Sequence, residues 1–159
     1  MPTPSEAVAR NELFRVDGVL DAHEQPARLL YITPRAVQWL NTNLENMASD
    51  GFYDNAATPA QQADDLFYSF IVGEDIAADL PPHVMLPAED GIWELRTPDL
   101  RMFGWFWRKG VFIISAINSA EMCKKHSLYA GYRNQAVGDR MAFNFEPPPF
   151  VNGGLNDVI

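Results

Sequence analysis

The most apolar part of the chain, residues 91–118, alternates in a way that predicts three strands. Residues 92–97, 100–107 and 111–118 are apolar and aromatic runs, separated by Pro-Asp and by Arg-Lys-Gly. Both separators are typical of turns, so we expect an antiparallel meander. Alternation along the second run places Arg101 on the same face as three aromatic residues. Those three are Phe103, Trp105 and Trp107, with Leu100, Met102 and Phe106 on the opposite face.

A short strand and an amphipathic helix are expected before the meander. Residues 28–33 form an apolar run of strand-forming residues, and the run ends at Thr33 and Pro34. Threonine followed by proline is typical of a helix start, because the hydroxyl caps the helix and proline suits its first turn. Apolar residues then recur at steps of three and four, which predicts a helix that stops at Asp50 and Gly51. These apolar positions are Val37, Leu40, Leu44 and Met47.

A second helix is predicted to begin at Thr58 and to end near Gly73. The Thr58 hydroxyl can cap the helix, and Gln61 lies three residues further on, as in a capping box. Glycine is the usual residue just beyond a helix end, which explains the predicted stop. The stripe expected to be buried is Ala63, Leu66, Phe67, Phe70 and Ile71.

The predicted fold class is therefore α+β, with two N-terminal helices packed on a small antiparallel β-sheet. Residues 1–27 are expected to form an N-terminal arm, and residues 28–140 the domain itself. Residues 141–159 are a tail rich in proline and glycine, for which no regular structure is expected. Within the domain, residues 78–91 are expected to form a loop, and the basic segment 121–140 to be helical in part.

Composition fits one domain and excludes several kinds of site. The chain has 159 residues, 47% of them hydrophobic, which is enough for one buried core. A single cysteine, Cys123, excludes a disulfide framework and a cysteine zinc site. His23, His83 and His126 stand at no metal-ligand spacing, so we expect neither a metal nor another cofactor. Because no apolar signal segment and no run of about 18 apolar residues occurs, we expect a cytoplasmic protein with no membrane partner.

Charge is divided unevenly along the chain, whose net charge is −9. Residues 1–95 contain 4 Lys or Arg against 16 Asp or Glu, whereas residues 96–140 contain 8 against 3. The negative total argues against general nucleic-acid binding, because phosphate binding needs positive charge. Two alternatives remain for the basic segment: a local anion-binding surface, or internal pairing with the acidic part.

Three short motifs lie in or just after the predicted sheet. They are Trp-Glu-Leu-Arg at residues 93–96, Leu-Arg-Met-Phe at residues 100–103 and the pair Lys124-Lys125. Together with the order of strand, two helices and three strands, they resemble the RelE/ParE toxin superfamily, and within it the phage-derived HigB-like branch. The resemblance covers about residues 28–138 and implies a RelE-like fold.

The resemblance also implies an activity and partners. RelE and HigB toxins of type II toxin–antitoxin systems cut mRNA, usually on the ribosome, and are neutralised by an antitoxin that often carries a helix-turn-helix. The chemistry is metal-free attack of a ribose 2′-OH on the adjacent phosphate, which needs a base, an acid and cations. ParE relatives instead act on DNA gyrase, and the sequence leaves this target open.

Four residues are candidate catalytic groups under this interpretation. Arg96 and Arg101 lie on neighbouring predicted strands, and an arginine fork can hold two phosphate oxygens. We expect both guanidinium groups to project into one solvent-reachable hollow. The structural alternatives are an ion pair between Arg96 and Glu94 and stacking of Arg101 on a tryptophan. The candidate proton-transfer group is His126 or Lys125, since histidine exchanges protons near neutral pH.

Further residues are candidates for RNA contact. On one continuous helix, Tyr129, Tyr132 and Arg133 would share a side with Lys125 and His126, where aromatic rings can stack on bases. The alternatives are a solvated basic face for the charged residues and a core position for the aromatic ones. The candidate RNA-binding residues are Lys124, Tyr129, Tyr132, Arg133 and Trp105.

Two functional hypotheses follow. In the first, the protein is an mRNA-cleaving toxin, which the Trp-Glu-Leu-Arg motif and the local positive charge favour. In the second, it is a non-catalytic phage-encoded protein on the same scaffold, whose acidic surface binds and inhibits a host protein. The acidic net charge favours this second hypothesis.

Overall fold

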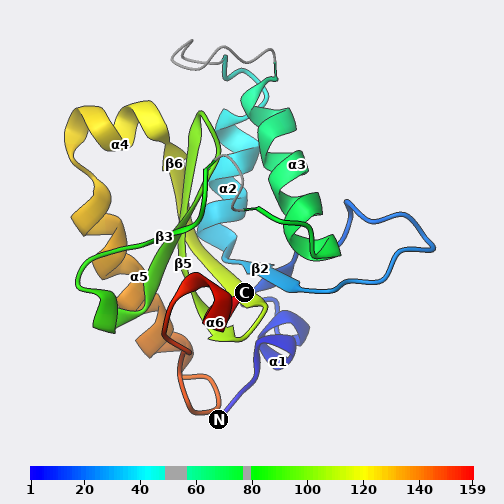
Figure 1. The fold of residues 1–159 in the computed structure, drawn as a ribbon, viewed down its shortest axis with the longest axis vertical. Helices are drawn as coiled ribbons and strands as arrows, with labels where there is room; N and C mark the ends of the chain where they lie inside the picture. The colour runs from blue at the N-terminus through cyan, green and yellow to red at the C-terminus, as the bar shows by residue number, and fades with distance from the viewer. Residues whose placement is uncertain (49–56, 77–79) are drawn as a thin grey trace.

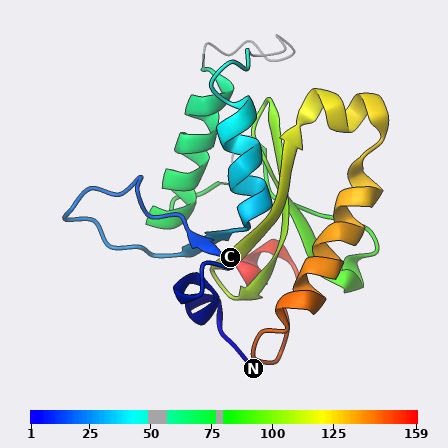
Figure 2. The ribbon, with the colours of Figure 1, turned by 180° about the vertical axis from the view of Figure 1, so that it is seen from behind.

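A six-stranded sheet stands between two layers of helices in the computed structural model, which describes residues 1–48, 57–76 and 80–159 (Figure 1). Helices α2 and α3 cover one face and α4 and α5 the other, as the view from behind also shows (Figure 2). The short helices α1 and α6 lie near the two termini. The helices are α1 (Pro4–Ala9), α2 (Pro34–Asn43), α3 (Pro59–Val72), α4 (Ala120–His126), α5 (Tyr129–Phe143) and α6 (Leu155–Val158).

The sheet is mixed and mostly antiparallel, with the strand order β1-β2-β6-β5-β4-β3. Strands β4, β5 and β6 are the predicted meander, so the α+β class with helices packed on a sheet is confirmed. Strand β2 lies parallel to β6, which differs from the fully antiparallel sheet we expected. The parallel pair is possible because α2 and α3 form a long crossover between β2 and the meander. The strands are β1 (Phe14–Arg15), β2 (Leu29–Ile32), β3 (His83–Val84), β4 (Ile92–Arg96), β5 (Leu100–Arg108) and β6 (Val111–Ser119).

Strand β5 separates two hydrophobic cores. Leu100, Met102 and Phe106 are fully buried in the core beneath α2 and α3. Phe103 and Trp105 are fully buried in the core beneath α4 and α5. The alternation predicted for this strand is confirmed, and burial of each such side chain contributes about 1.5–3 kcal/mol.

The starts of both predicted helices are confirmed by their caps. The Thr33 hydroxyl accepts a hydrogen bond from the N–H of Ala36 at 3.2 Å. The Thr58 hydroxyl accepts one from the N–H of Gln61 at 3.2 Å. The second helix ends at the expected glycine, because Gly73 adopts the left-handed conformation with φ 87°.

Helix α2 is shorter than predicted. It ends at Asn43, whose side-chain amide donates to the carbonyl of Trp39 at 2.9 Å. Asparagine bonds to nearby backbone groups in this way and favours helix ends over helix interiors. The predicted stop at residues 50–51 lies outside the described residues. None of the described helices combines the length and the hydrophobicity that crossing a membrane requires.

Both chain ends are built into the domain. The N-terminal arm forms α1 and β1, and β1 pairs with β2 at one edge of the sheet. The expectation that residues 141–159 lack regular structure is wrong at α6. This helix is held down because Val158 is fully buried and its carbonyl accepts from the N–H of Gly110 at 2.7 Å. The segment 78–91, predicted to be a loop, also contains β3 and a 3-10 turn at Ala88–Asp90.

The segment predicted to be partly helical, residues 121–140, is two helices rather than one. Ser127 adopts a left-handed conformation with φ 52° and ends α4. Helix α5 then runs in a different direction (Figure 1). The helical phase assumed for Lys125, His126 and Tyr129 is therefore wrong, because the break removes the common helix axis.

A β-bulge bends the central pair of strands. The register between β5 and β6 shifts between Phe103 and Gly104, and Ser115 is the additional residue on β6. A Cβ atom on Gly104 would overlap the backbone carbonyl oxygen of Ile113. Only glycine fits here, because the two backbones approach closely at the bulge.

We predict that Gly104→Ala lowers the free energy of unfolding by about 1–3 kcal/mol, because the methyl group must displace a neighbouring backbone. Gly138→Ala on α5 is the control, since a Cβ there meets nothing within 4 Å. This control should raise the free energy of unfolding by about 0.5–1 kcal/mol, as alanine is the better helix former. Urea denaturation measures both, and equal midpoints for the two variants would contradict the account of the bulge.

Candidate functional site

Arg96 and Arg101 lie directly opposite each other on β4 and β5, so both side chains start from the same face of the sheet. This agrees with the sequence-based prediction. Arg101, however, is only 4% exposed, and its Nη1 donates to the carbonyls of Thr97 at 2.6 Å and Leu100 at 2.9 Å. The expectation that both guanidinium groups are open to solvent is therefore wrong for Arg101. Bound to backbone carbonyls in the interior, it is not placed to hold a phosphate.

A buried amide fixes the turn that receives Arg101. The side-chain carbonyl of Gln62 on α3 accepts from the Thr97 hydroxyl at 2.9 Å and from the N–H of Asp99 at 3.0 Å. The amide nitrogen of Gln62 donates to the Asp99 carboxylate at 2.6 Å. All three residues are buried. The carbonyl of Thr97 is thereby held where Arg101 can reach it.

Arg96 lies at the edge of the same face. Its Nε and Nη2 donate to the carbonyl of Pro81 at 3.1 and 2.8 Å. The same Nε lies 4.0 Å from Oε1 of Glu94, which is the ion pair considered from the sequence. Because the Arg96 side chain keeps 24% of its surface exposed, it stays accessible from outside.

Glu94 is a buried acid among these cations, with 6% of its surface exposed. Its Oε1 lies 3.7 Å from Nδ1 of His83 on β3. Its Oε2 has no hydrogen-bond partner among the described residues. Burial raises the pKa of this carboxyl, and the charge of Arg101 opposes the rise more strongly than do those of His83 and Arg96. A buried carboxyl with a raised pKa beside an open hollow is a candidate proton acceptor.

Glu94 and His83 line a hollow of about 460 Å³. Met85 and Leu86 add apolar surface to its lining, and Tyr129, Ala130 and Arg133 of α5 complete it. Tyr129 packs edge-on against Phe103, with ring centroids 6.0 Å apart. Burial raises the pKa of the Tyr129 hydroxyl, so it stays protonated at neutral pH and can donate a hydrogen bond.

Two buried polar atoms of residues lining this hollow have no partner among the described residues. One is the acceptor Oε2 of Glu94, and the other is the donor Nε of Arg133. The Arg133 side chain is held in place by its Nη1, which donates to the carbonyl of Leu86 at 2.6 Å. Buried polar groups nearly always have partners in folded proteins. Both atoms are themselves buried, so a ligand in the hollow reaches them only when the two side chains turn toward it.

The other candidate residues lie elsewhere. Lys124, Lys125 and His126 form the exposed last turn of α4, where positive charge favours the C-terminal end of a helix. None of the three lines the hollow at Glu94. Trp105 is fully buried beneath α5, so it fills the core and is not placed to contact RNA. Tyr132 lines a different hollow, beside α2.

Of the residues predicted from the sequence, Arg96, Arg101, Tyr129 and Arg133 lie near Glu94, whereas Glu94 and His83 themselves were not among the candidates. Glu94 carries a signal that could have identified it, because it shares a strand face with two arginines in an apolar segment. His83 has no comparable signal. It reaches the site through β3, a strand of two residues that no periodicity can predict.

Comparisons with known proteins assign the chain to no family. No family model matches it, and no curated protein or solved structure is significantly similar to it. The resemblance to the RelE/ParE superfamily therefore stays a prediction from the motifs and the order of elements. Among the described residues, no group of three or more His, Cys, Asp or Glu side chains is arranged to hold a metal ion.

We predict that Arg101→Gln raises the pKa of Glu94, because the carboxylate loses the positive charge that favours its ionised form most strongly. Arg101→Lys keeps the charge and should shift this pKa less. Glu94 in Arg101→Gln should therefore ionise only at a higher pH than in the native protein. NMR titration of isotope-labelled glutamate carboxyl groups measures the shift, and an unchanged titration of Glu94 would show that the two side chains do not interact.

Proposed function

We propose that this protein is a metal-free endoribonuclease of the RelE/HigB kind, acting as an mRNA-cleaving toxin. The observation that carries the proposal is that two residues lining one hollow each have a buried polar atom without a partner, Oε2 of Glu94 and Nε of Arg133. A ribose 2′-OH donates a hydrogen bond and the adjacent phosphate accepts one, so a single RNA linkage would supply both missing partners once the two side chains turn toward the hollow. The motifs that resemble the HigB-like branch support the same reaction independently.

In the proposed reaction, Glu94 takes the proton of the 2′-OH while O2′ attacks the phosphorus. The bond from phosphorus to O5′ breaks, which leaves a 2′,3′-cyclic phosphate and a free 5′-OH. The raised pKa of Glu94 makes its carboxylate a stronger base than an exposed glutamate. His83 faces Glu94 through Nδ1, so Nε2 is the nitrogen assigned to protonate the departing O5′.

The three arginines near Glu94 have two different roles in this proposal. Arg133 lines the hollow and Arg96 lies beside Glu94, so these two are assigned to the charge that develops on the phosphorane. Each now donates to a neutral backbone carbonyl, and a phosphate oxygen is the stronger acceptor. Arg101 touches no RNA in this assignment and acts as a positioning residue that favours the ionised form of Glu94.

We predict that Glu94→Gln and His83→Asn each slow RNA cleavage by about 10²–10⁴-fold, because each removes a proton-transfer group while keeping a polar side chain of similar size. His126→Asn is the matched control, since His126 is an exposed histidine on α4 that does not line the hollow. This control should cleave at the native rate. The measurement is cleavage of single-stranded RNA in the presence of EDTA, with detection of the 2′,3′-cyclic phosphate ends.

Two other results would contradict this proposal, one for the residues assigned to proton transfer and one for the activity itself. Loss of cleavage in His126→Asn, with full activity in His83→Asn, would place the proton-transfer group on α4, as the sequence alone suggested. A native protein that cleaves no RNA with or without ribosomes, and whose expression leaves growth unaffected, would contradict the toxin proposal altogether.

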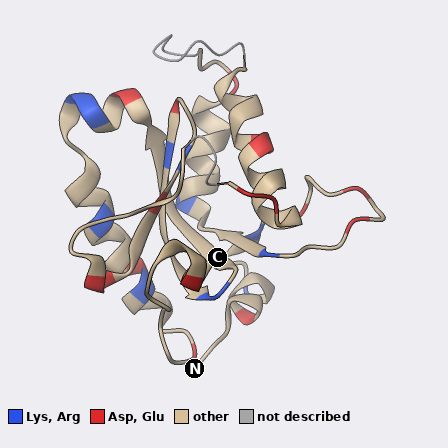
Figure 3. Ribbon diagram, viewed as in Figure 1, with Lys and Arg blue, Asp and Glu red and all other residues tan. Residues whose placement is uncertain are grey.

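A second candidate function, inhibition of a host protein through the acidic half, is favoured by the separation of charge (Figure 3). Acidic positions mark α3 and the loop that leaves the body between β1 and β2, whereas α4 and α5 together carry four basic residues against two acidic ones, Glu121 and Asp139. Tyr68 of α3 donates to Glu24 of that loop at 2.6 Å. This hydrogen bond raises the pKa of Tyr68, and the charges of Glu74 and Asp21 raise it further. Three carboxylates thus surround one tyrosine and form a compact negative surface.

The two functions predict opposite patterns of growth inhibition. If host binding is the function, reversing the acidic surface with Asp21→Lys and Glu74→Lys abolishes inhibition, while Glu94→Gln leaves it intact. If RNA cleavage is the function, Glu94→Gln abolishes inhibition and the double charge reversal leaves it. Expression level and thermal melting of each variant confirm that folding is unchanged.

A further inference from the structure

A second hollow, of about 300 Å³, lies between α2 and α5 beside strand β6. Strand β2 pairs only with residues 111–114 of β6, because the chain leaves the sheet at Thr33 to begin α2. On the side of β6 where β2 ends, the remainder of the strand lies next to helix α2, while its other side stays paired with β5. Ala116 and Ile117 of this part line the hollow.

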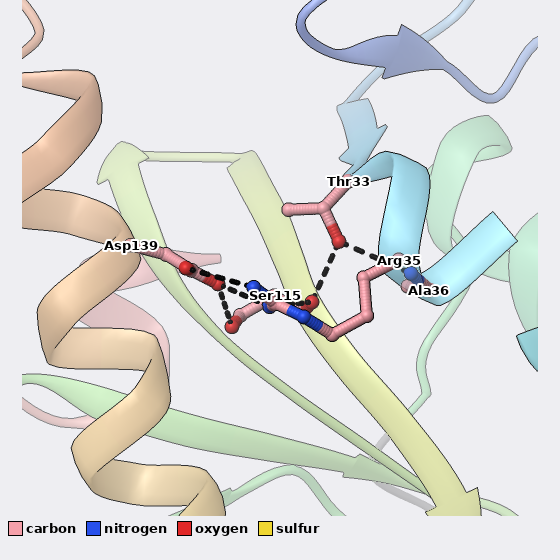
Figure 4. A network of polar contacts seen from close by, with 5 residues as sticks. All are labelled: Thr33, Arg35, Ala36, Ser115 and Asp139. Carbon is pink, nitrogen blue, oxygen red and sulfur yellow. Dashed lines mark hydrogen bonds and ion pairs between the residues drawn. The ribbon is translucent and has the colours of Figure 1, made fainter. Parts of the chain in front are cut away.

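Polar contacts hold α2 and α5 at a fixed spacing next to this hollow (Figure 4). Arg35 at the start of α2 donates to both carboxylate oxygens of Asp139 on α5, at 2.8 and 3.4 Å. The same carboxylate accepts from the Ser115 hydroxyl at 2.5 Å. The Thr33 hydroxyl donates to the carbonyl of Ser115 at 2.6 Å. The hollow is therefore formed before any ligand arrives, which lowers the cost of binding.

Two aromatic side chains from different helices line the hollow, Trp39 of α2 and Tyr132 of α5. The Tyr132 ring stacks on Phe103, with centroids 4.8 Å apart and planes 13° apart. Its hydroxyl accepts from the amide of Asn118 at 2.8 Å. One face of the tyrosine ring is thus occupied and the orientation of the ring is set.

Polar side chains of α2 line the same hollow. Gln38 and Asn43 bring side-chain amides to the lining and Thr42 brings a hydroxyl. The nitrogen of the Asn43 amide donates to the Trp39 carbonyl, so its oxygen remains as an acceptor. Aromatic surfaces next to amides and hydroxyls are the features that bind an unpaired nucleobase, which stacks through its face and forms hydrogen bonds through its edge.

We infer that this hollow binds one unpaired base of the RNA strand whose phosphate lies at Glu94. The inference rests on the proposed ribonuclease function and adds to it a base-binding subsite away from the hollow at Glu94. Tyr129 in the first hollow and Tyr132 in the second are on the first turn of α5, so a strand that joins the two hollows crosses that turn. A volume of 300 Å³ is at the lower end of ligand sites, about 300–1,000 Å³, which suits a single base.

The test measures RNA affinity in a Glu94→Gln background, which keeps an acceptor for the 2′-OH and slows cleavage enough for binding to be measured. Fluorescence anisotropy compares labelled RNA of about eight nucleotides with RNA of about three. Trp39→Leu should weaken binding of the longer RNA by about tenfold or more, because stacking of one base contributes about 1–3 kcal/mol. The shorter RNA should bind unchanged. Trp39→Phe, which keeps a ring, should restore most of the affinity for the longer RNA.

Trp107→Leu is the matched control, because Trp107 is another partly buried tryptophan and lines neither hollow. It should leave both affinities unchanged. If Trp39→Leu binds both lengths as tightly as its parent while the native protein still cleaves RNA, the inference is overturned and the proposed function stands. Equal weakening at both lengths also overturns it, since that result indicates a general structural role for Trp39. A native protein that neither binds nor cleaves RNA of any length overturns both.

Discussion

The structure around the site depends on one electrostatic constraint: a carboxylate buried on a sheet must have positive charge close to it. Placing a charge in the interior without compensation is costly, and the group then tends to become neutral. Arg101 supplies the strongest compensation for Glu94 from within the sheet. Its guanidinium is held by the Thr97 carbonyl, and that turn is held by Gln62 of α3. Packing on one face of the sheet therefore controls ionisation on the other.

The separation of charge also gives the molecule a direction for binding. The acidic loop and α3 lie on one side of the sheet, the first hollow adjoins α5 on the other side, and the second lies between α2 and α5 at the edge of β6. Under the proposed function, RNA approaching the acidic side is repelled, whereas approach toward α4 and α5 meets Lys124, Lys125, Arg133 and Arg140. The net charge of −9 is therefore compatible with a local RNA site, and the same acidic surface is available to a protein partner.

Local patterns in the sequence predicted the parts of the fold that local chemistry controls. The alternation in β5 and the threonine caps of α2 and α3 are properties of a few neighbouring residues. The burial of Arg101 could not be predicted, because it depends on Gln62, which is distant in the sequence. The break between α4 and α5 could not be predicted from Ser127, since serine adopts the left-handed conformation less readily than glycine. The candidate site was predicted in part for the same reason: its arginines follow the strand period, whereas His83 arrives through a contact between distant segments.

The most direct test of the central claim is a crystal structure of Glu94→Gln with a bound single-stranded oligoribonucleotide. The account predicts one ribose 2′-oxygen within about 2.6–3.2 Å of the side chain at position 94, with the adjacent phosphate on Arg133. RNA bound only along the lysines of α4, with the hollow at Glu94 filled by solvent, would contradict it.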